Sequence, residues 1–449
     1  MKHPVLTLLN KWYLLSIILL LSDGLRSQDF SALVESAWNN NAQLKSKNFN
    51  LAVAQFRYNE AKKMYGPELS ANIQYTLASG GRSIDIPVGD LLNPVYQTLN
   101  ILTQSNVFPT IENTEERLLP NNFYDAKFSL TQPIYYPDLA INKAIRLEQI
   151  NLNQLEIKAY KRWVVKDVMT AWFQYKMAHE AEKIFMSADT LLSEAIRSTK
   201  SMIRNGIALP SDLARLDNQS ALLKNQQIDA AKNIRIAEHY LRFILGIKDM
   251  ADIPIGPSPK DLPNIDQINE LNTREEIDQI QQSIKMQNLA YKAEKQFYLP
   301  RIGLQVDAGS QDFDFGWQPY VLMGVNAKVN IFDSNKHHVK KQILETEIAS
   351  SEQQLQYASN QIALQNKIAR ENLLAAIEQA NNYTHRIEAT RKLYDDIYRK
   401  YNEGTSGYLE LTDAQTQYTQ MQIQALIARY QAWTRWAEMI YSAAIYKID

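Results

Sequence analysis

The chain has 449 residues, and its 48 Lys and Arg against 49 Asp and Glu give a formal net charge of −1. This balance excludes a nucleic-acid binder, which needs a basic surface, and 45% hydrophobic with 22% charged residues excludes a bundle of membrane-spanning helices. The absence of Cys excludes disulfides, thiolate metal sites, cysteine nucleophiles and a lipidated N-terminal Cys, and the scarcity of Gly, 14 residues, favours a helix-rich fold.

The first residues have the pattern of a signal peptide. Lys2 and Lys11 precede an apolar run, Trp12 to Leu21, which gives way to small and polar residues up to Ser27. The run is well short of the roughly 20 residues that a membrane span requires, which disfavours a short N-terminal anchor. We therefore predict a cleaved leader over residues 1–27 and a secreted protein.

The rest of the chain consists of two tandem copies of one pattern. Three landmarks recur in the same order, and the second and third recur with offsets of 197 and 198 residues. We predict a first repeat over 28–250, a Pro-rich linker over 251–271 and a second repeat over 272–449. The landmarks are Pro67 and Pro300, where a helix runs into a strand; Gln132–Tyr135 and Val329–Phe332, where a strand re-enters a helix; and Gly206 and Gly404, in turns between helices.

Each repeat contains two segments in which apolar and polar residues alternate with a period of two, as in a β-strand with two different faces. Their length is near the roughly 9 to 11 residues of a tilted membrane-crossing strand, although a small soluble sheet packed on helices would show the same alternation. We predict strands near 68–78 and 123–135 in the first repeat, and near 300–309 and 319–332 in the second.

The Pro landmarks of the two repeats lie 233 residues apart, whereas the strand-to-helix landmarks that follow them lie 197 residues apart. The first repeat therefore carries about 36 extra residues between its two strands. They fall in segment 79–120, which is rich in Gly and Pro. We predict a long loop there, either extended or folded on itself.

Two uninterrupted helices are predicted over residues 139–205 and 335–402, which contain neither Pro nor Gly. At about 1.5 Å per residue each extends on the order of 100 Å. The second has a stripe that repeats every seven residues, which indicates left-handed supercoiled packing. The stripe holds many Ala, Thr and Tyr, with Gln and Asn between them. This composition fits a polar-lined tube of helices and also a plain coiled-coil spacer.

The sequence offers no catalytic constellation. Its six His show no ligand spacing, and it contains no phosphate-binding Gly loop with a Lys and no Gly-x-Ser-x-Gly elbow. We therefore expect no enzyme, no metal site and no cofactor.

These features together resemble the TolC-type outer-membrane efflux protein family, over the whole chain after the leader. The most specific marks are the two helix turns, within residues 206–215 and 401–414, and the strand-to-helix passages at Gln132–Tyr135 and Asn330–Asp333. The resemblance implies a mostly α fold with a transmembrane β-barrel: three chains contribute four strands each to a 12-stranded barrel, continued by a long coiled-coil α-helical tunnel. Oligomerisation is also required physically, because open sheet edges are not tolerated in lipid.

The resemblance further implies the function of a trimeric channel-tunnel in the cell outer membrane, with the tunnel extending into the periplasm. Such a channel is the exit duct of a tripartite efflux or type I secretion system and passively exports small molecules or proteins. Its partners are two further copies of the chain, outer-membrane lipid, a periplasmic adaptor (membrane fusion protein) and an inner-membrane transporter.

The turns between the paired helices, residues 205–211 and 402–408, are the tip turns in this resemblance. Gly206 and Gly404 suit helix ends that require positive φ, and Pro210 and Ser406 suit the start of the next helix. The residues expected to contact the adaptor are Asn205, Gly206, Ile207 and Ala208 in the first turn, and Glu403, Gly404, Thr405 and Ser406 in the second.

Both turns repeat an acid six residues after the Gly, at Asp212 and Glu410, and Asp413 shares a helix face with Glu410. By resemblance these acids line the closed periplasmic aperture, where threefold repetition would make rings that attract cations. First-turn acids that only complement the helix dipole are the alternative, worth about 0.3–1 kcal/mol each.

Tyr401 and Asp212 resemble family residues that hold neighbouring helix pairs shut. Ser406 replaces a basic residue of the family pattern, so gating would depend on Tyr401 and Asp212 together with Arg215 or Arg399. The alternative function is a soluble periplasmic coiled-coil scaffold or adaptor, but two full repeats and 14 Gly disfavour it.

Overall fold

The computed structural model describes residues 31–249, 258–259, 261–265 and 273–448. The predicted signal peptide lies outside these residues, as does most of the predicted linker 251–271. The chain forms two compact units. Unit 1 consists of Met1–Gln55, Glu148–Gln287 and Thr346–Asp449, and unit 2 consists of Phe56–Leu147 and Asn288–Glu345.

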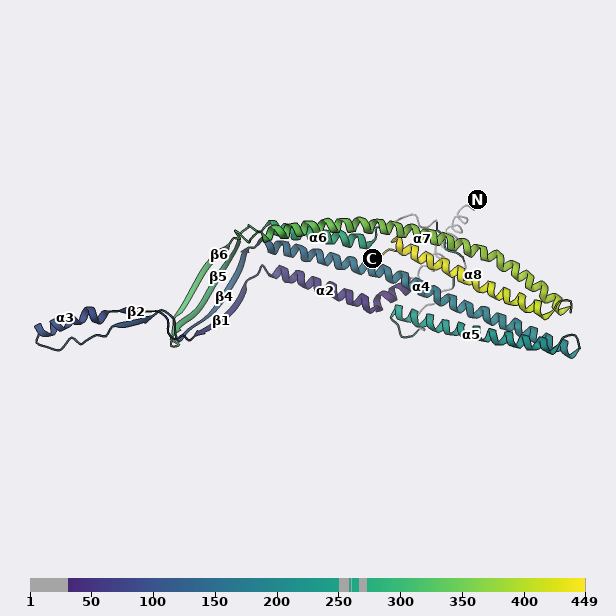
Figure 1. Ribbon diagram of the computed structural model, residues 1–449, viewed down its shortest axis with the longest axis horizontal. Coiled ribbons are helices and arrows are strands. Elements are labelled where there is room, and N and C mark those ends of the chain that lie inside the picture. Colours follow the sequence, from purple (N-terminus) through teal and green to yellow (C-terminus); the bar gives the residue numbers. More distant parts are fainter. Residues whose placement is uncertain (1–30, 250–257, 260, 266–272, 449) are drawn as a thin grey trace, which may run out of the picture. The chain divides into compact units, whose positions relative to one another are not determined.

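Unit 2 is built on a four-stranded antiparallel sheet in the order β1-β4-β5-β6 (Figure 1). The first repeat contributes β1 (Glu68–Thr76) and β4 (Phe123–Tyr135), and the second contributes β5 (Arg301–Phe313) and β6 (Pro319–Lys328). The two repeats therefore meet at the β4–β5 ladder. In the described chain β1 and β6 are the edges of this sheet, and each leaves a row of backbone groups without a strand partner.

One face of this sheet is apolar across all four strands. It is also exposed, since 83% of Ile73 and 76% of Val321 are accessible. The period-two alternation explains the arrangement, because the register aligns apolar positions of neighbouring strands. Two successive rows are Leu69, Leu130, Val306 and Met323, then Ala71, Phe128, Ala308 and Val321.

The opposite face of the sheet carries polar side chains that contact one another. Lys127 Nζ lies 3.5 Å from an Asp125 carboxylate oxygen and 3.8 Å from one of Asp307. The Tyr320 hydroxyl donates to Asp125 at 2.8 Å. The sheet thus separates an apolar face from a hydrogen-bonded polar face.

The sequence predicted a long loop over segment 79–120. The segment folds on itself and has regular secondary structure. It contains β2 (Ser83–Ile86) paired with β3 (Thr114–Arg117), and a 15-residue helix, α3 (Val88–Leu102), between them. Pro94 lies inside this helix. The Pro content suggested irregular structure, but Pro94 removes only one backbone donor and the rest of the helix forms around it.

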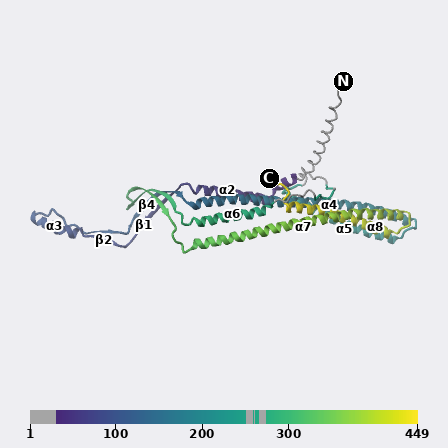
Figure 2. The same cartoon turned by 90° about the horizontal axis from the view of Figure 1, so that it is seen from above.

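The remaining elements are helices. The two long ones, α4 and α7, start and end within two residues of the predicted ranges. Each forms a hairpin with the next helix, α4 with α5 and α7 with α8 (Figures 1 and 2). Among the described helices, none is both long enough and apolar enough to cross a membrane. The bounds are α2, Ala42–Lys63; α4, Pro137–Arg204; α5, Pro210–Leu245; α6, Glu275–Lys295; α7, Lys336–Asn402; and α8, Tyr408–Ser442.

Unit 1 has its largest core where α4, α5 and α8 meet the N-terminal helical residues. Leu33 and Val34 pack there with Val164 and Val168 of α4, together with Leu245 of α5. A second core lies near the hairpin ends, where Leu192 and Ala195 of α4, Leu216 of α5, Tyr401 of α7 and Leu411 of α8 pack together. Small Ala side chains in these two cores let the helices approach closely.

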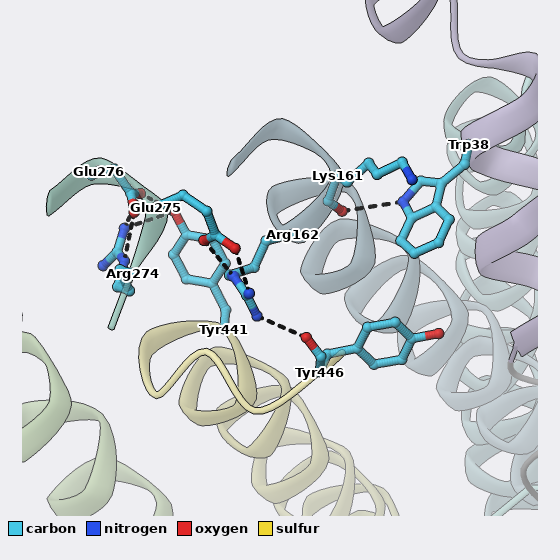
Figure 3. A network of polar contacts seen from close by, with 8 residues as sticks. All are labelled: Trp38, Lys161, Arg162, Arg274, Glu275, Glu276, Tyr441 and Tyr446. Atoms are coloured by element: carbon cyan, nitrogen blue, oxygen red, sulfur yellow. Dashed lines mark hydrogen bonds and ion pairs between the residues drawn. The ribbon is translucent and has the colours of Figure 1, made fainter. Parts of the chain in front are cut away.

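A buried polar network joins three distant segments of unit 1 (Figure 3). Arg162 of α4 holds Glu275 at the start of α6 in a bidentate ion pair, with Nε–Oε2 and Nη2–Oε1 distances of 2.8 and 2.6 Å. The third Arg162 nitrogen donates to the Tyr446 carbonyl at 2.9 Å. Arg162 and Glu275 are 7% exposed each. The network thus fastens the start of the second repeat and the end of the chain to the first repeat.

Candidate functional site

The candidate site is the pair of hairpin ends in unit 1. In the first, α4 ends in a Schellman motif: Gly206 adopts φ +72°, its N–H donates to the Ile203 carbonyl at 3.0 Å, and the Ile207 N–H donates to the Met202 carbonyl at 2.9 Å. Pro210 is the first residue of α5, where its missing N–H costs nothing. The positive φ explains why Gly occupies the turn.

The second hairpin end repeats this motif. Gly404 adopts φ +74°, its N–H donates to the Tyr401 carbonyl at 3.0 Å, and the Thr405 N–H donates to the Lys400 carbonyl at 2.9 Å. The prediction that Ser406 begins the next helix is wrong. The last non-helical residue is Gly407, and α8 starts at Tyr408.

The three acids expected at the aperture each have a local hydrogen-bond partner. Asp212 accepts the Leu209 N–H at 3.0 Å and so caps its own helix, and Asp413 accepts from Gln417 Nε2 at 2.8 Å. The Glu410 carboxylate accepts from the Ser406 hydroxyl. Glu410 and Asp413 are exposed, and within the described chain neither they nor Asp212 form an ion pair. Their negative charge is therefore not neutralised by a basic side chain of the same protomer.

Tyr401 is buried and bonded within its own chain. Its hydroxyl lies 2.5 Å from Thr199 Oγ1, and Thr199 in turn donates to the Ala195 carbonyl at 2.8 Å. Since the Thr199 proton is directed to that carbonyl, the Tyr401 hydroxyl is the donor to Thr199. The bond joins α7 to α4, and among the described residues no hydrogen bond joins Tyr401 to Asp212.

An aromatic stack lies in the same core as Tyr401. The Tyr394 ring stacks on Tyr398 of the same helix and on Tyr418 of α8, with centroids 5.9 Å apart in both pairs. Burial, with nearby tyrosines and acids contributing, raises the pKa of Tyr394 to about 12. Tyr394 therefore stays uncharged at physiological pH.

A link between the two hairpins was not predicted from the sequence. Arg215 of α5 donates to the Tyr408 hydroxyl of α8, and its guanidinium lies over that ring, 5.7 Å from the centroid. Gln219 donates to Thr416 Oγ1 at 3.1 Å. Arg215 was a predicted gating residue, but its partner lies 193 residues away, and no local pattern identifies Tyr408. Arg399, the other basic candidate, pairs with Asp396 of its own helix.

The turns also expose apolar side chains. Ile207 and Leu209 in the first turn are 67% and 65% accessible, and Leu409 at the start of α8 is 56% accessible. Such exposed apolar side chains at a helix end suit a contact with another protein.

Comparisons with known proteins agree with this fold. Residues 269–442 match the family model described as outer membrane efflux protein. The outer-membrane channel OprN superposes with a TM-score of 0.71 at 14% identity, covering 93% of this chain and 90% of that chain. The VceC outer-membrane protein of Vibrio cholerae gives a TM-score of 0.71 at 12% identity (93% and 96%), and the Campylobacter jejuni CmeC outer-membrane channel gives 0.70 at 14% (92% and 85%). No curated protein sequence matches the chain.

The fold is thus that of solved outer-membrane channel proteins. By sequence, residues 269–442 match the outer membrane efflux protein family, and the fold of a solved outer-membrane channel extends over nearly the whole chain. The predicted resemblance is confirmed, and so is the mostly helical fold built from helix-strand repeats. Both comparisons thus lead to outer-membrane efflux or channel proteins, and neither leads to an enzyme.

Proposed function

We propose that three copies of this chain form one channel-tunnel that serves as the exit duct of a tripartite efflux or type I secretion system. The sheet of unit 2 carries the proposal. It has an exposed apolar face, a polar face, and two edge strands, β1 and β6, that need partners if the sheet lies in lipid. Pairing of β1 with β6 of the next copy would satisfy both edges, and three copies would give 12 strands.

In such a barrel the apolar face of the sheet would contact lipid and the polar face would contact water. The rows through Leu69 and Ala71 would face lipid, and the rows through Asp125 and Lys127 would face the water-filled lumen. In the periplasm, the long helices would continue the barrel as a tunnel. Small molecules or proteins would pass through it without catalysis or cofactor.

At the hairpin ends, Glu410 and Asp413 would line the periplasmic aperture, joined by Asp212. Their carboxylates are exposed or half-exposed and form no ion pair with the described basic residues of their own chain, so threefold repetition would give rings of negative charge. Such rings favour cations over anions. Tyr401 and Asp212 would contribute to closure, Tyr401 by holding α7 against α4 through Thr199.

The tip turns would receive the periplasmic adaptor. Residues 205–208 and 403–406 lie at the ends of the two hairpins, and the exposed Ile207 and Leu209 offer apolar contacts there. Through that adaptor the channel would connect to an inner-membrane transporter, which supplies the energy and selects the cargo.

Single-channel conductance in planar bilayers tests the proposal. The detergent-extracted protein should form a cation-selective pore, and Glu410→Gln with Asp413→Asn should weaken that selectivity. Glu403→Gln is the matched control, because it removes an exposed acid of the same turn outside the proposed ring. If well-folded protein stays soluble without detergent and forms no pore, the periplasmic scaffold is the better assignment.

A further inference from the structure

The insertion between β1 and β4 is the largest departure from the two-repeat pattern. We call residues 79–120 the extension. The second repeat has only residues 314–318 at the corresponding place, between β5 and β6. In the extension, β2 and β3 form a two-stranded stem, and α3 lies between them in the chain (Figure 1).

The extension has a defined internal structure because asparagine side chains fasten α3 to the returning segment. Asn93 Nδ2 donates to the Ile111 carbonyl and its Oδ1 accepts the Ile111 N–H, both at 2.8 Å. Asn100, seven residues on, makes the same pair of bonds with Phe108 at 2.9 and 3.1 Å. Seven residues are two helical turns, so both clamps lie on one face of α3.

The opposite face of α3 presents an apolar stripe to solvent. Leu91, Val95 and Leu102 on it are 69%, 51% and 75% accessible. The spacing along the stripe alternates between three and four residues, which is the pattern of helices that pack side by side in a left-handed coiled coil. The stripe consists of Val88, Leu91, Val95, Thr98 and Leu102.

The net charge of the extension indicates whether lipid or protein covers this stripe. The extension holds two Arg against five Asp and Glu, a net charge of −3, so an anionic lipid surface would repel it. Asp90 is the one charged residue of α3, and it is bonded to Asn113 on the clamped side. Identical copies of the helix can therefore meet along the stripe without placing like charges opposite each other.

We propose that the α3 stripe packs against the same stripe of the other two protomers and forms a parallel three-helix bundle at the outer end of the channel. This inference rests on the proposed trimer. The extension follows β1, the edge strand that the neighbouring chain must pair with, so the bundle continues that interface. Cyclic symmetry places the same stripe residue of each copy in one layer. The occupant of the stripe is thus two further copies of this chain.

The absence of Cys from the chain gives a direct test. In the full-length, detergent-solubilised protein, Thr98→Cys places a single thiol in the middle of the stripe. Core positions of neighbouring coiled-coil helices approach closely enough for a disulfide, whose Cα atoms lie about 4.4–6.8 Å apart. Mild oxidation should therefore crosslink Thr98→Cys within the trimer. Gln97→Cys, the exposed neighbour pointing away from the stripe, is the control and should crosslink several-fold less.

A second variant separates the stripe from the rest of the interface. Adding Leu91→Asn and Leu102→Asn to Thr98→Cys should abolish the crosslink while the mass measured by light scattering stays trimeric. A trimer in which Thr98→Cys and Gln97→Cys crosslink equally, or in which crosslinks join separate trimers, would overturn the inference. Protein that is not trimeric before oxidation would instead refute the proposed channel.

Discussion

Replacing Glu275 by Gln should destabilise unit 1 strongly, because it leaves the buried Arg162 charge without its carboxylate. Arg162 donates twice to Glu275, at 2.8 and 2.6 Å, and both residues are nearly inaccessible. Removing one partner of such a pair costs about 3–5 kcal/mol of unfolding free energy, since the remaining charge has no compensating group. The bond from Arg162 to the Tyr446 carbonyl offsets little of this loss.

The same pair predicts a dependence of stability on pH. Burial by itself raises the pKa of Glu275, but hydrogen bonds from Arg162 and the attraction of Arg162 and Arg274 outweigh it and leave the pKa below its ordinary value of 4.5. A lowered folded-state pKa gives stability that is fully present above pH 4.5 and is lost as pH falls through the folded-state value. The Gln variant should lack this contribution.

Urea unfolding of the detergent-solubilised protein, followed by helical circular dichroism, measures both effects. Glu438→Gln is the matched control, because Glu438 pairs with Arg435 on the surface and such exposed pairs contribute about 0–1 kcal/mol. Changing both partners together, Arg162→Met with Glu275→Leu, should restore much of the loss. A Glu275→Gln cost no larger than that of the control would refute the assignment of this pair as the fastening of the second repeat.

Three further outcomes follow from the structure. Met323→Lys on the apolar sheet face should prevent stable membrane insertion, at a cost of about 2–4 kcal/mol near mid-membrane, whereas Leu322→Lys on the opposite face should insert; equal membrane fractionation of both variants would contradict the assignment of faces. Gly404→Ala should cost about 1–2 kcal/mol of unfolding free energy because of its positive φ, and Gly407→Ala, at φ −79° with open space around it, should cost almost nothing. Tyr401→Phe with Asp212→Ala should raise conductance in planar bilayers if these residues hold the aperture closed. The single variant Tyr401→Phe removes only the bond to Thr199. Unchanged conductance of the double variant would argue against a gating role.

The repeating parts of the fold were predictable from the sequence, whereas long-range side-chain pairings were not. The long helices α4 and α7 lack Pro and Gly throughout, and the strands alternate with a period of two, so local patterns were sufficient. The extension was predicted as a loop because its helix depends on Asn93 and Asn100 bonding a returning segment, which no local pattern reveals.

At the candidate site the same limit applies. The two Gly turns were predictable, since the positive φ of a Schellman motif favours Gly. The Tyr401 bond to Thr199 and the Arg215 bond to Tyr408 join residues about 200 positions apart, so the partners became known only from the fold. The helix start at Tyr408 was missed because Ser406 uses its hydroxyl on Glu410 rather than as a cap.

The β4–β5 ladder makes each repeat half of a shared sheet rather than a domain of its own. The two strands pair from Phe123 to Tyr135 across the boundary between the repeats, although α4, α5 and α6 separate them in the chain. Two polypeptides, one ending and the other beginning in the segment between α5 and α6, would therefore carry complementary edges as well as the separate members of the Arg162–Glu275 pair. We expect such halves, produced together in one cell, to reassemble as a split protein. The fold would then not depend on the covalent connection between the two repeats.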